Sequence, residues 1–273
     1  MIRTPKPQTE FRRLGDRLAL FHAQDTQDRY WSDYWRDFDF DSLETSEGFA
    51  SLGELGPIFE KHVHPGDRVL EAGCGAGRIM AACVSENFEV LGIEFSEDVV
   101  SAVRERASFL DVQQGDVEKL DLPDKSFDVY VSLGVVEHHF GGPELALEEA
   151  WRVLRRQGCI LISVPFLIPL RARCLSNLSG RNKDSSLSFH QYYFSQDQLG
   201  QALAATGFEV VDHLPYDVEA FLLGEHPLFS RFWVSALCRE RVRSAFRQRF
   251  PQARPAIRSR FGHMLLAIGM NQV

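Results

Sequence analysis

Val69-Leu70-Glu71-Ala72-Gly73-Cys74-Gly75-Ala76-Gly77-Arg78 is the segment that decides the fold of this 273-residue chain. A short apolar run enters a glycine-rich turn, and a helix is predicted to leave it. Glycines permit a tight turn and let the backbone approach a ligand at the helix start, where unpaired N–H groups favour a negatively charged group. Glu94 ends the next predicted strand about 20 residues on, the spacing at which an acid accepts hydrogen bonds from both ribose hydroxyls. Together these features indicate a cofactor that contains adenosine.

The spacing of the turn argues against a nicotinamide dehydrogenase. A dinucleotide fingerprint has the form G-x-G-x-x-G/A, and counting from Gly73 places Arg78 at the position that needs a small residue. A bulky arginine there disfavours a pyrophosphate lying on the helix.

From Asp67 onward, short β-rich runs alternate with helical patterns, which is typical of βαβ units. We therefore expect an α/β fold with a doubly wound, seven-stranded, mostly parallel sheet of Rossmann-like type, in which the last strand is antiparallel. The strands are expected at residues 67–72, 89–93, 111–115, 127–133, 159–165, 207–214 and 263–270. The helices are expected at residues 48–62, 77–86, 96–109, 142–156, 195–206 and 227–249.

Two segments fall outside this alternation. Residues 1–47 are rich in aromatic side chains and are predicted to form a helical cap. Within it, the pairs Tyr30/Tyr34 and Trp31/Trp35 are each four residues apart, so each pair shares a helix face that either packs on the main domain or covers a ligand. Residues 166–194 are predicted to be an insertion, and long insertions often cover a site.

Composition and charge narrow the class of protein. The chain is 44% hydrophobic and 25% charged, as in an ordinary globular protein. Five widely spaced cysteines without a metal-ligand pattern suit a reducing compartment, and the polar first ten residues lack a signal peptide, so we expect a cytoplasmic protein without a metal site.

The net charge of −8 disfavours nucleic-acid binding, whereas residues 231–260 hold nine arginines and one acid, Glu240. That basic stretch is either a solvated helix face or a peripheral contact with an acidic membrane, since no apolar run is long enough to span a bilayer.

The glycine turn and the motifs that follow it resemble the class I S-adenosylmethionine-dependent methyltransferases, in particular the small-molecule group called type 11 or type 12. Glu71 to Gly77 resembles the family's E/D-x-G-x-G-x-G signature, and further similar motifs follow in order over about residues 50–215. These are Ile93-Glu94-Phe95-Ser96, Gly115-Asp116-Val117 with Leu122-Pro123, Phe127 to Val131, Val136-Glu137-His138, Leu154 to Cys159, and Tyr193-Phe194-Ser195 with Gly207-Phe208. Gln157 and Cys159 depart from the family pattern in a loop away from the cofactor. The resemblance implies a methyltransferase domain over residues 48–273.

The resemblance also implies the residues that bind S-adenosyl-L-methionine. The backbone of Ala72, Gly73 and Gly75 would pass the methionine part, and Glu71 would orient its ammonium. Glu94 would hold the ribose. The remaining implied ligands are Asp116 for the adenine amino group, Val117 and Phe95 for the two faces of the ring, Leu133 for the ammonium through its carbonyl, and Arg78 for the carboxylate.

The acceptor side is less defined by the sequence. Methyl transfer from a sulfonium needs alignment, exclusion of water and, for a hydroxyl acceptor, removal of a proton. His138 and His139 follow the fourth strand of the alternating region and are the candidate bases, because histidine titrates near neutrality. His190, Tyr193 and Tyr34 are the candidate acceptor-binding residues.

We therefore expect an enzyme that moves a methyl group to an O, N or C atom of a small molecule. A cofactor-binding scaffold or regulatory partner with the same fold, and a methyltransferase acting on a lipid or quinone precursor, are the alternatives. The sequence predicts neither the acceptor nor the oligomeric state.

Overall fold

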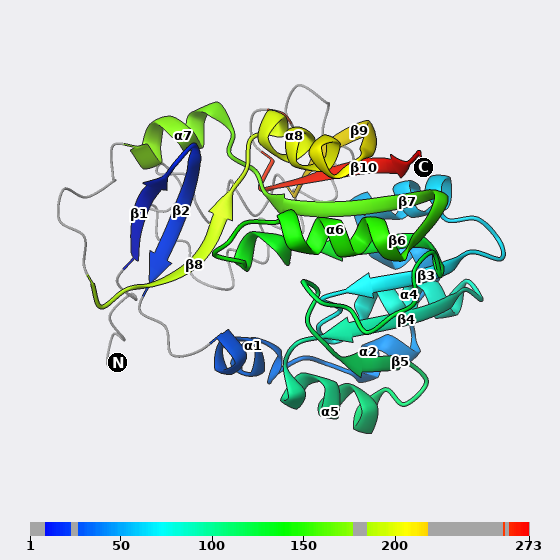
Figure 1. Ribbon diagram of the computed structural model, residues 1–273. Coiled ribbons are helices and arrows are strands. Elements are labelled where there is room, and N and C mark those ends of the chain that lie inside the picture. Colours follow the sequence, from blue (N-terminus) through cyan, green and yellow to red (C-terminus); the bar gives the residue numbers. More distant parts are fainter. Residues whose placement is uncertain (1–8, 23–26, 177–184, 218–258, 260–261, 273) are drawn as a thin grey trace, which may run out of the picture.

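The centre of the molecule is a seven-stranded sheet in the order β5-β4-β3-β6-β7-β10-β9 (Figure 1). The computed structural model describes residues 9–22, 27–176, 185–217, 259 and 262–272. Strands β3 to β7 pair in parallel, whereas β10 is antiparallel to both of its neighbours. The predicted doubly wound, Rossmann-like sheet with an antiparallel last strand is confirmed. The strands are β3 (Arg68–Ala72), β4 (Glu89–Glu94), β5 (Asp111–Gln114), β6 (Phe127–Leu133), β7 (Leu154–Pro165), β9 (Phe208–Tyr216) and β10 (Met264–Asn271).

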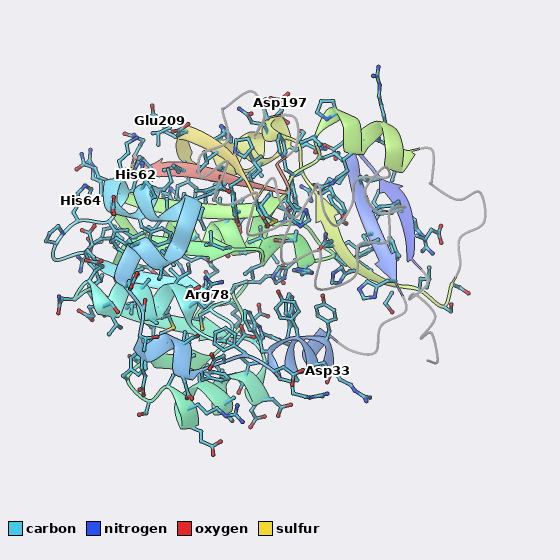
Figure 2. The ribbon with its side chains drawn as sticks, turned by 180° about the vertical axis from the view of Figure 1, so that it is seen from behind. Asp33, His62, His64, Arg78, Asp197 and Glu209 are labelled. Carbon is cyan, nitrogen blue, oxygen red and sulfur yellow. The ribbon has the colours of Figure 1, made fainter. Side chains whose placement is uncertain are left out.

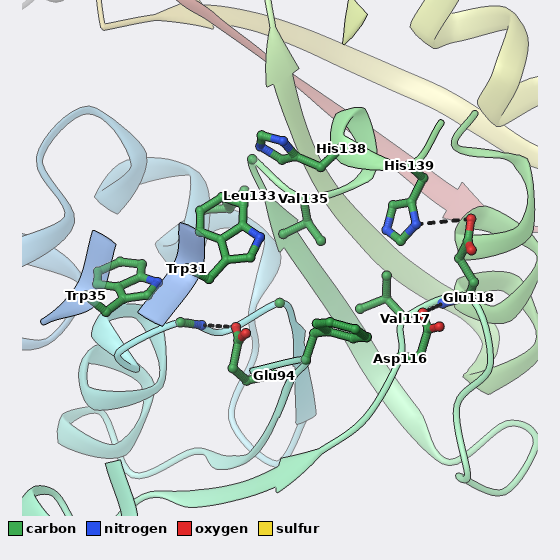
Figure 3. A pocket seen from close by; sticks show the side chains of 14 residues that line it. Trp31, Trp35, Glu94, Asp116, Val117, Glu118, Leu133, Val135, His138 and His139 are labelled. Carbon is green, nitrogen blue, oxygen red and sulfur yellow. Dashed lines mark hydrogen bonds and ion pairs between the residues drawn. The ribbon is translucent and has the colours of Figure 1, made fainter. Parts of the chain in front are cut away.

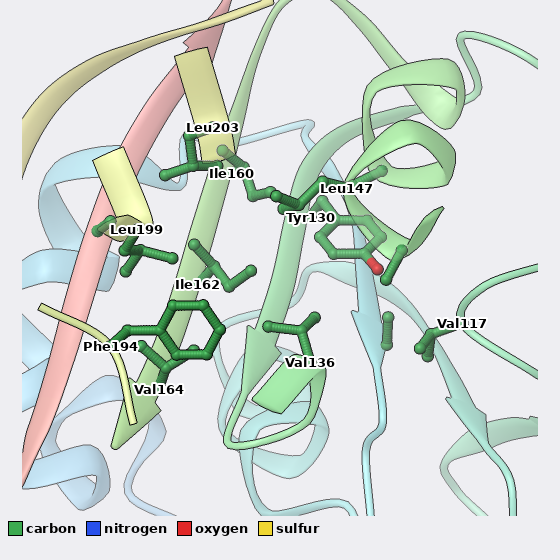
Figure 4. Close-up of a cluster of buried hydrophobic side chains, with 14 of the residues drawn as sticks. Val117, Tyr130, Val136, Leu147, Ile160, Ile162, Val164, Phe194, Leu199 and Leu203 are labelled. Carbon is green, nitrogen blue, oxygen red and sulfur yellow. The ribbon is translucent and has the colours of Figure 1, made fainter. Parts of the chain in front are cut away.

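Helices cover both faces of this sheet, so its central strands are buried on both sides. On β7, Ile160 and Ile162 point into one apolar cluster with α6 and α8 (Figure 4), whereas Leu161 points into a second cluster with α3, α4 and α5. This alternation follows from the two-residue period of a strand, and it explains the nearly continuous apolar sequence of β7. The helices are α3 (Gly56–His62), α4 (Arg78–Ser85), α5 (Glu97–Arg106), α6 (Glu144–Val153) and α8 (Gln196–Thr206).

Two elements differ most from the expected ones. Helix α6 ends at Val153, and β7 begins at Leu154, five residues before the expected start. The strand is extended because Leu154 pairs with Phe127, and the Arg155 guanidinium lies 2.8 Å from the Asp128 carboxylate. The expected helix 48–62 is divided into the 3-10 helix η1 (Gly48–Leu55) and α3, and Gly53, with a φ of 59°, interrupts the helical backbone within η1.

A second, smaller sheet joins the N-terminal segment to the insertion after β7. Strands β1 (Thr9–Leu14) and β2 (Arg17–His22) form a hairpin, and β8 (Ser188–Tyr193) pairs with β2. The description of residues 1–47 as helical missed this hairpin, although helices α1 (Gln27–Trp35) and α2 (Asp41–Glu44) follow it. The insertion likewise contains α7 (Pro169–Ser176) and β8. The hairpin turn has Gly15 at a φ of 63°, a conformation that a two-residue Gly-Asp turn favours.

A hydrogen bond between two histidines joins the small sheet to the main domain. His138 lies on the 3-10 turn η2 (Val136–His138) directly after β6, and its Nδ1 is 2.8 Å from the backbone oxygen of His190 on β8. Because a carbonyl only accepts, Nδ1 carries the proton and Nε2 is the acceptor nitrogen. The ring of His190 also lies 4.2 Å from that of His22 on β2. Burial lowers the pKa of His138 to about 4, so this imidazole is neutral near pH 7.

Several predicted features lie outside the described residues: the expected helix 227–249, the arginines of 231–260 and Cys238. Among the residues that the structure describes, no helix is both long and apolar enough to cross a membrane.

The buried His138 predicts a dependence of stability on pH. An unfolded chain protonates this histidine below its ordinary pKa of 6.5, whereas the folded chain does so only near 4, so stability is present above pH 6.5 and is lost as the pH falls. Between pH 7 and 5 we expect His138 to account for about 2 kcal/mol of lost unfolding free energy. Urea unfolding of the wild type and of His138→Gln measures this loss, which should be smaller in the variant. His64→Gln, at an exposed histidine (Figure 2), is the control and should behave like the wild type. Equal pH dependence in the wild type and in His138→Gln would contradict the assignment.

Candidate functional site

The glycine turn lies between the end of β3 and the start of α4, at the carboxyl edge of the sheet. Gly73 and Gly75 have φ values of 81° and 52°, in the left-handed region that glycine adopts without strain. A side chain at Gly73 would collide with Val135, and one at Gly75 would collide with the indole ring of Trp35. Both positions therefore require glycine for conformation and for space.

Glu94, at the end of β4, holds this turn in place. Its Oε2 accepts a hydrogen bond of 3.0 Å from the backbone N–H of Gly75, and its Oε1 accepts one of 2.9 Å from Ser96. The side chain is 6% exposed and lies on the wall of a pocket. The predicted association of the glycine turn with the next strand's acid is thus present in the structure.

The pocket has a volume of about 340 Å³ and opens at the carboxyl edge of β3, β4 and β6 (Figure 3). It brings together most of the residues that were predicted from the sequence to bind the cofactor or act as a base. Those that line it are Gly73, Gly75, Glu94, Phe95, Asp116, Val117, Leu133, His138 and His139.

Five further lining residues were not among the predicted site residues: Trp31, Trp35, Glu118, Gly134 and Val135. Glu118 lies next to the predicted Asp116 and Val117, and its Oε1 is 3.1 Å from Nδ1 of His139. Trp31 and Trp35 come from α1, and the ring of Trp31 lies 4.9 Å from that of His138. Their four-residue spacing was the available signal, since it placed both indoles on one helix face.

Tyr34 does not line this pocket. Helix α1 presents Trp31 and Trp35 to the cavity, so Tyr34 lies on the outer face and is 61% exposed. Acceptor binding by Tyr34 stays a prediction; its place outside the lining follows from the rotation of α1 about its axis, which helix spacing alone does not define.

The other two predicted acceptor residues also lie outside the lining. Tyr193, the last residue of β8, is buried, and the Arg171 guanidinium lies 5.1 Å from its ring centre. His190 lies behind His138 and positions it through the backbone oxygen described above. Burial, together with the neighbouring histidines, lowers the pKa of His190 to about 3.

Three predicted cofactor residues lie beside the pocket without lining it. Ala72 is buried at the end of β3. Glu71 is buried and accepts a 3.0 Å hydrogen bond from the backbone N–H of Met80, which satisfies a donor of the first turn of α4. Burial raises the pKa of Glu71 well above its ordinary value, and the neighbouring Glu94 adds to this. Arg78, the first residue of α4, is exposed to solvent (Figure 2).

The charge of the pocket limits what it can bind. Three carboxylate residues, Glu94, Asp116 and Glu118, line it, and among the described residues the lining contains no lysine or arginine. Such a wall favours ligands that carry hydroxyl or amino donors or a positive charge, and it disfavours a pyrophosphate. Val117 and the half-exposed Phe95 add apolar surface for a flat ring. These residues therefore fit an adenosyl group that carries a cationic centre.

Comparison with known proteins agrees with a binding site for S-adenosylmethionine in this pocket. Residues 70–162 match the family described as "Methyltransferase domain". A Mycolicibacterium smegmatis protein named "Probable S-adenosylmethionine-dependent methyltransferase" is 32% identical over 160 residues, which cover 58% of each chain. The demethylmenaquinone methyltransferase of Symbiobacterium thermophilum is 30% identical over 121 residues, 40% of this chain and 48% of that protein. The chain thus spans about half the length of the curated relatives it matches.

The solved structure of a SAM-dependent methyltransferase from Archaeoglobus fulgidus has a similar fold. Its TM-score is 0.55 at 17% identity, and the match covers 90% of this chain and all of that one. Residues 70–162 are thus similar to a methyltransferase domain, and the sheet topology agrees with the fold of the matched structure.

Proposed function

We propose that the protein is an enzyme that transfers a methyl group from S-adenosyl-L-methionine to an O, N or C atom of a small molecule. The observation that carries this proposal is the gathering of Gly73, Gly75, Glu94, Asp116 and Leu133 on one pocket wall. These residues lie at the carboxyl ends of four strands or in the turns that follow them, and the family resemblance implies that each contacts the same cofactor. When bound, S-adenosyl-L-methionine supplies a methyl group on a positively charged sulfur.

In this proposal, Glu94 holds the ribose hydroxyls. The carboxylate lies on the pocket wall, and each of its oxygens can accept more than one hydrogen bond. Asp116 accepts from the adenine amino group, and Val117 and Phe95 lie on the two faces of the ring. The carbonyl of Leu133 and the backbone of Gly73 contact the methionine part.

The other lining residues prepare the acceptor side. Trp31 and Trp35 exclude water from the pocket, which strengthens the electrostatic interactions inside it. His138 is held as a neutral imidazole whose Nε2 accepts a hydrogen bond, and Glu118 orients His139. Either imidazole can therefore accept a hydrogen bond or a proton from a hydroxyl acceptor.

Because the chain spans about half the length of its curated relatives, the methyl acceptor of the whole protein also belongs to the proposal. A quinone precursor is a specific alternative, because one matched relative is named as a demethylmenaquinone methyltransferase. The basic residues 231–260, through which a lipid-like acceptor could be reached from a membrane surface, lie outside the described residues.

The role of Glu94 predicts the cofactor affinity of a variant. Calorimetry should show binding of S-adenosylhomocysteine to the wild type, and Glu94→Gln should raise the Kd about tenfold or more, the cost of losing a hydrogen bond to a charged group. Glu105→Gln, at an exposed residue of α5, is the matched control and should bind as the wild type does. The absence of binding to the wild type, or equal affinity in Glu94→Gln with an unchanged melting temperature, would refute this role.

The positions of Trp31 and Trp35 predict a change in intrinsic fluorescence when a ligand enters the pocket. Trp31 and Trp35 line the pocket, whereas Trp151 on α6 packs near Gly207. Titration with S-adenosylhomocysteine should therefore change the intrinsic fluorescence, and the double variant Trp31→Phe/Trp35→Phe should lose most of that change. Trp151→Phe should retain it. A response that depends on Trp151 instead would place the ligand elsewhere.

A further inference from the structure

Glu137 carries a buried carboxyl group that the site described so far does not use. It lies on η2, between the lining residues Val135 and His138, and is 2% exposed. Among the described residues, its Oε2 has no hydrogen-bond partner. A buried polar atom without a partner costs free energy, so its retention calls for a ligand or a function.

This carboxyl group lies immediately behind the pocket wall. A side-chain atom placed on the lining residue Gly134 would be 3.6 Å from Oε1 of Glu137 and 3.8 Å from Met264 at the start of β10. On the neighbouring strands, the hydroxyl of Tyr216 donates a 3.0 Å hydrogen bond to Oγ of Ser163. Polar groups from η2, β7 and β9 thus meet at the carboxyl edge of the sheet, where open α/β sheets bind their ligands.

The groups around Glu137 offer lone pairs rather than protons. The Nε2 of His138 is 3.9 Å from Oε1 of Glu137 and is the acceptor nitrogen, because Nδ1 donates to His190. The proton of Tyr216 is directed to Ser163. In the described part of the chain, no lysine or arginine forms an ion pair with Glu137. Among the described residues, this carboxyl group therefore lacks a positively charged donor.

The pKa of Glu137 agrees with its burial among groups that offer lone pairs. Burial raises the pKa of Glu137 to about 8, because desolvation disfavours the ionised form. A ligand that brings its own positive charge would stabilise that form, whereas a phosphate or carboxylate would be repelled. A hydroxyl group brings a donor but no charge.

We propose that the methyl acceptor carries a primary or secondary amine, and that this amine binds as an ammonium ion against the carboxylate of Glu137. The inference rests on the proposed function and narrows its acceptor from an O, N or C atom to nitrogen. It also gives Glu137, rather than His138 or His139, the direct contact with the reacting group.

The chemistry of an amine acceptor requires such a group. An ammonium nitrogen has no lone pair, so one proton must first pass from it to the Glu137 carboxylate. The freed lone pair then forms the N–C bond while the C–S bond of the methyl donor breaks, and sulfur keeps the electron pair. The proton on Glu137 leaves to solvent afterwards. A carboxyl group whose pKa is raised toward that of an amine is a better acceptor for this proton than an ordinary glutamate.

The test uses the full chain, labelled S-adenosyl-L-methionine and a deproteinised low-molecular-mass cell extract as the source of acceptors. One half of the extract is treated with an N-hydroxysuccinimide ester of acetate, which blocks primary and secondary amines, and then with hydroxylamine, which removes acetyl groups from oxygen. We expect the wild type to release S-adenosylhomocysteine with the untreated extract and to lose at least nine-tenths of this activity with the blocked one, since about 90% marks a tenfold effect.

Variants connect this activity to Glu137. Glu137→Gln should lower the rate with the untreated extract about tenfold or more, as for loss of a charged hydrogen bond, while its Kd for S-adenosylhomocysteine stays as in the wild type. Glu105→Gln is the surface control and should keep both. Full activity of Glu137→Gln, or full activity of the wild type with the blocked extract, would overturn the inference; the second measurement needs no variant and so does not depend on how Glu137→Gln folds. Absence of turnover by the wild type despite cofactor binding would instead refute the proposed function, and the inference with it.

Discussion

The hydrogen bond from the Gly75 backbone to the Glu94 carboxylate is the interaction on which the site depends. It joins the turn after β3 to the end of β4, two strands that are neighbours in a parallel sheet. The backbone oxygen of Ile93 adds to the same junction by accepting from the N–H groups of Gly73 and Cys74, at 2.7 and 2.9 Å. Backbone donors that would otherwise be unsatisfied are thus bound to the adjacent strand. One wall of the pocket therefore has a fixed geometry before any ligand arrives.

The opposite wall depends on this junction through packing. Because Gly75 lacks a side chain, the indole of Trp35 can lie directly on the turn, and Val135 occupies the equivalent space over Gly73. The N-terminal helix α1 therefore contacts the site through the space that glycine leaves, and a methyl group at either position would push the two walls apart. The same glycines that permit the turn also permit the closure of the pocket.

Placement in the pocket was predicted more completely for residues at the ends of β3, β4 and β5, the proposed donor side, than for those of the proposed acceptor side, and the reason is physical. Residues of the donor side follow single strands at fixed short distances, so the strand–turn–helix pattern placed Glu94 and Asp116 correctly in one pocket. The hairpin β1–β2 was missed because its third strand, β8, lies more than 160 residues further along the chain, and no local pattern predicts that pairing. Tyr34 was chosen over Trp31 because helix spacing does not give the rotation of the helix. Glu137 was passed over because its burial arises from packing of distant strands.

This difference between the two sides follows from their origin in the chain. The donor side consists of loops of the parallel sheet itself, whereas His138 is positioned by β8 from the insertion, and Trp31 comes from the N-terminal segment. Segments added to the sheet can vary without disturbing the junction of Gly75 and Glu94, so they are suited to set which acceptor enters. The buried carboxyl of Glu137 lies on the boundary, on a turn of the sheet but facing β9 and β10. We infer that the charge of the acceptor is selected at this boundary, and that its shape is selected by the added segments.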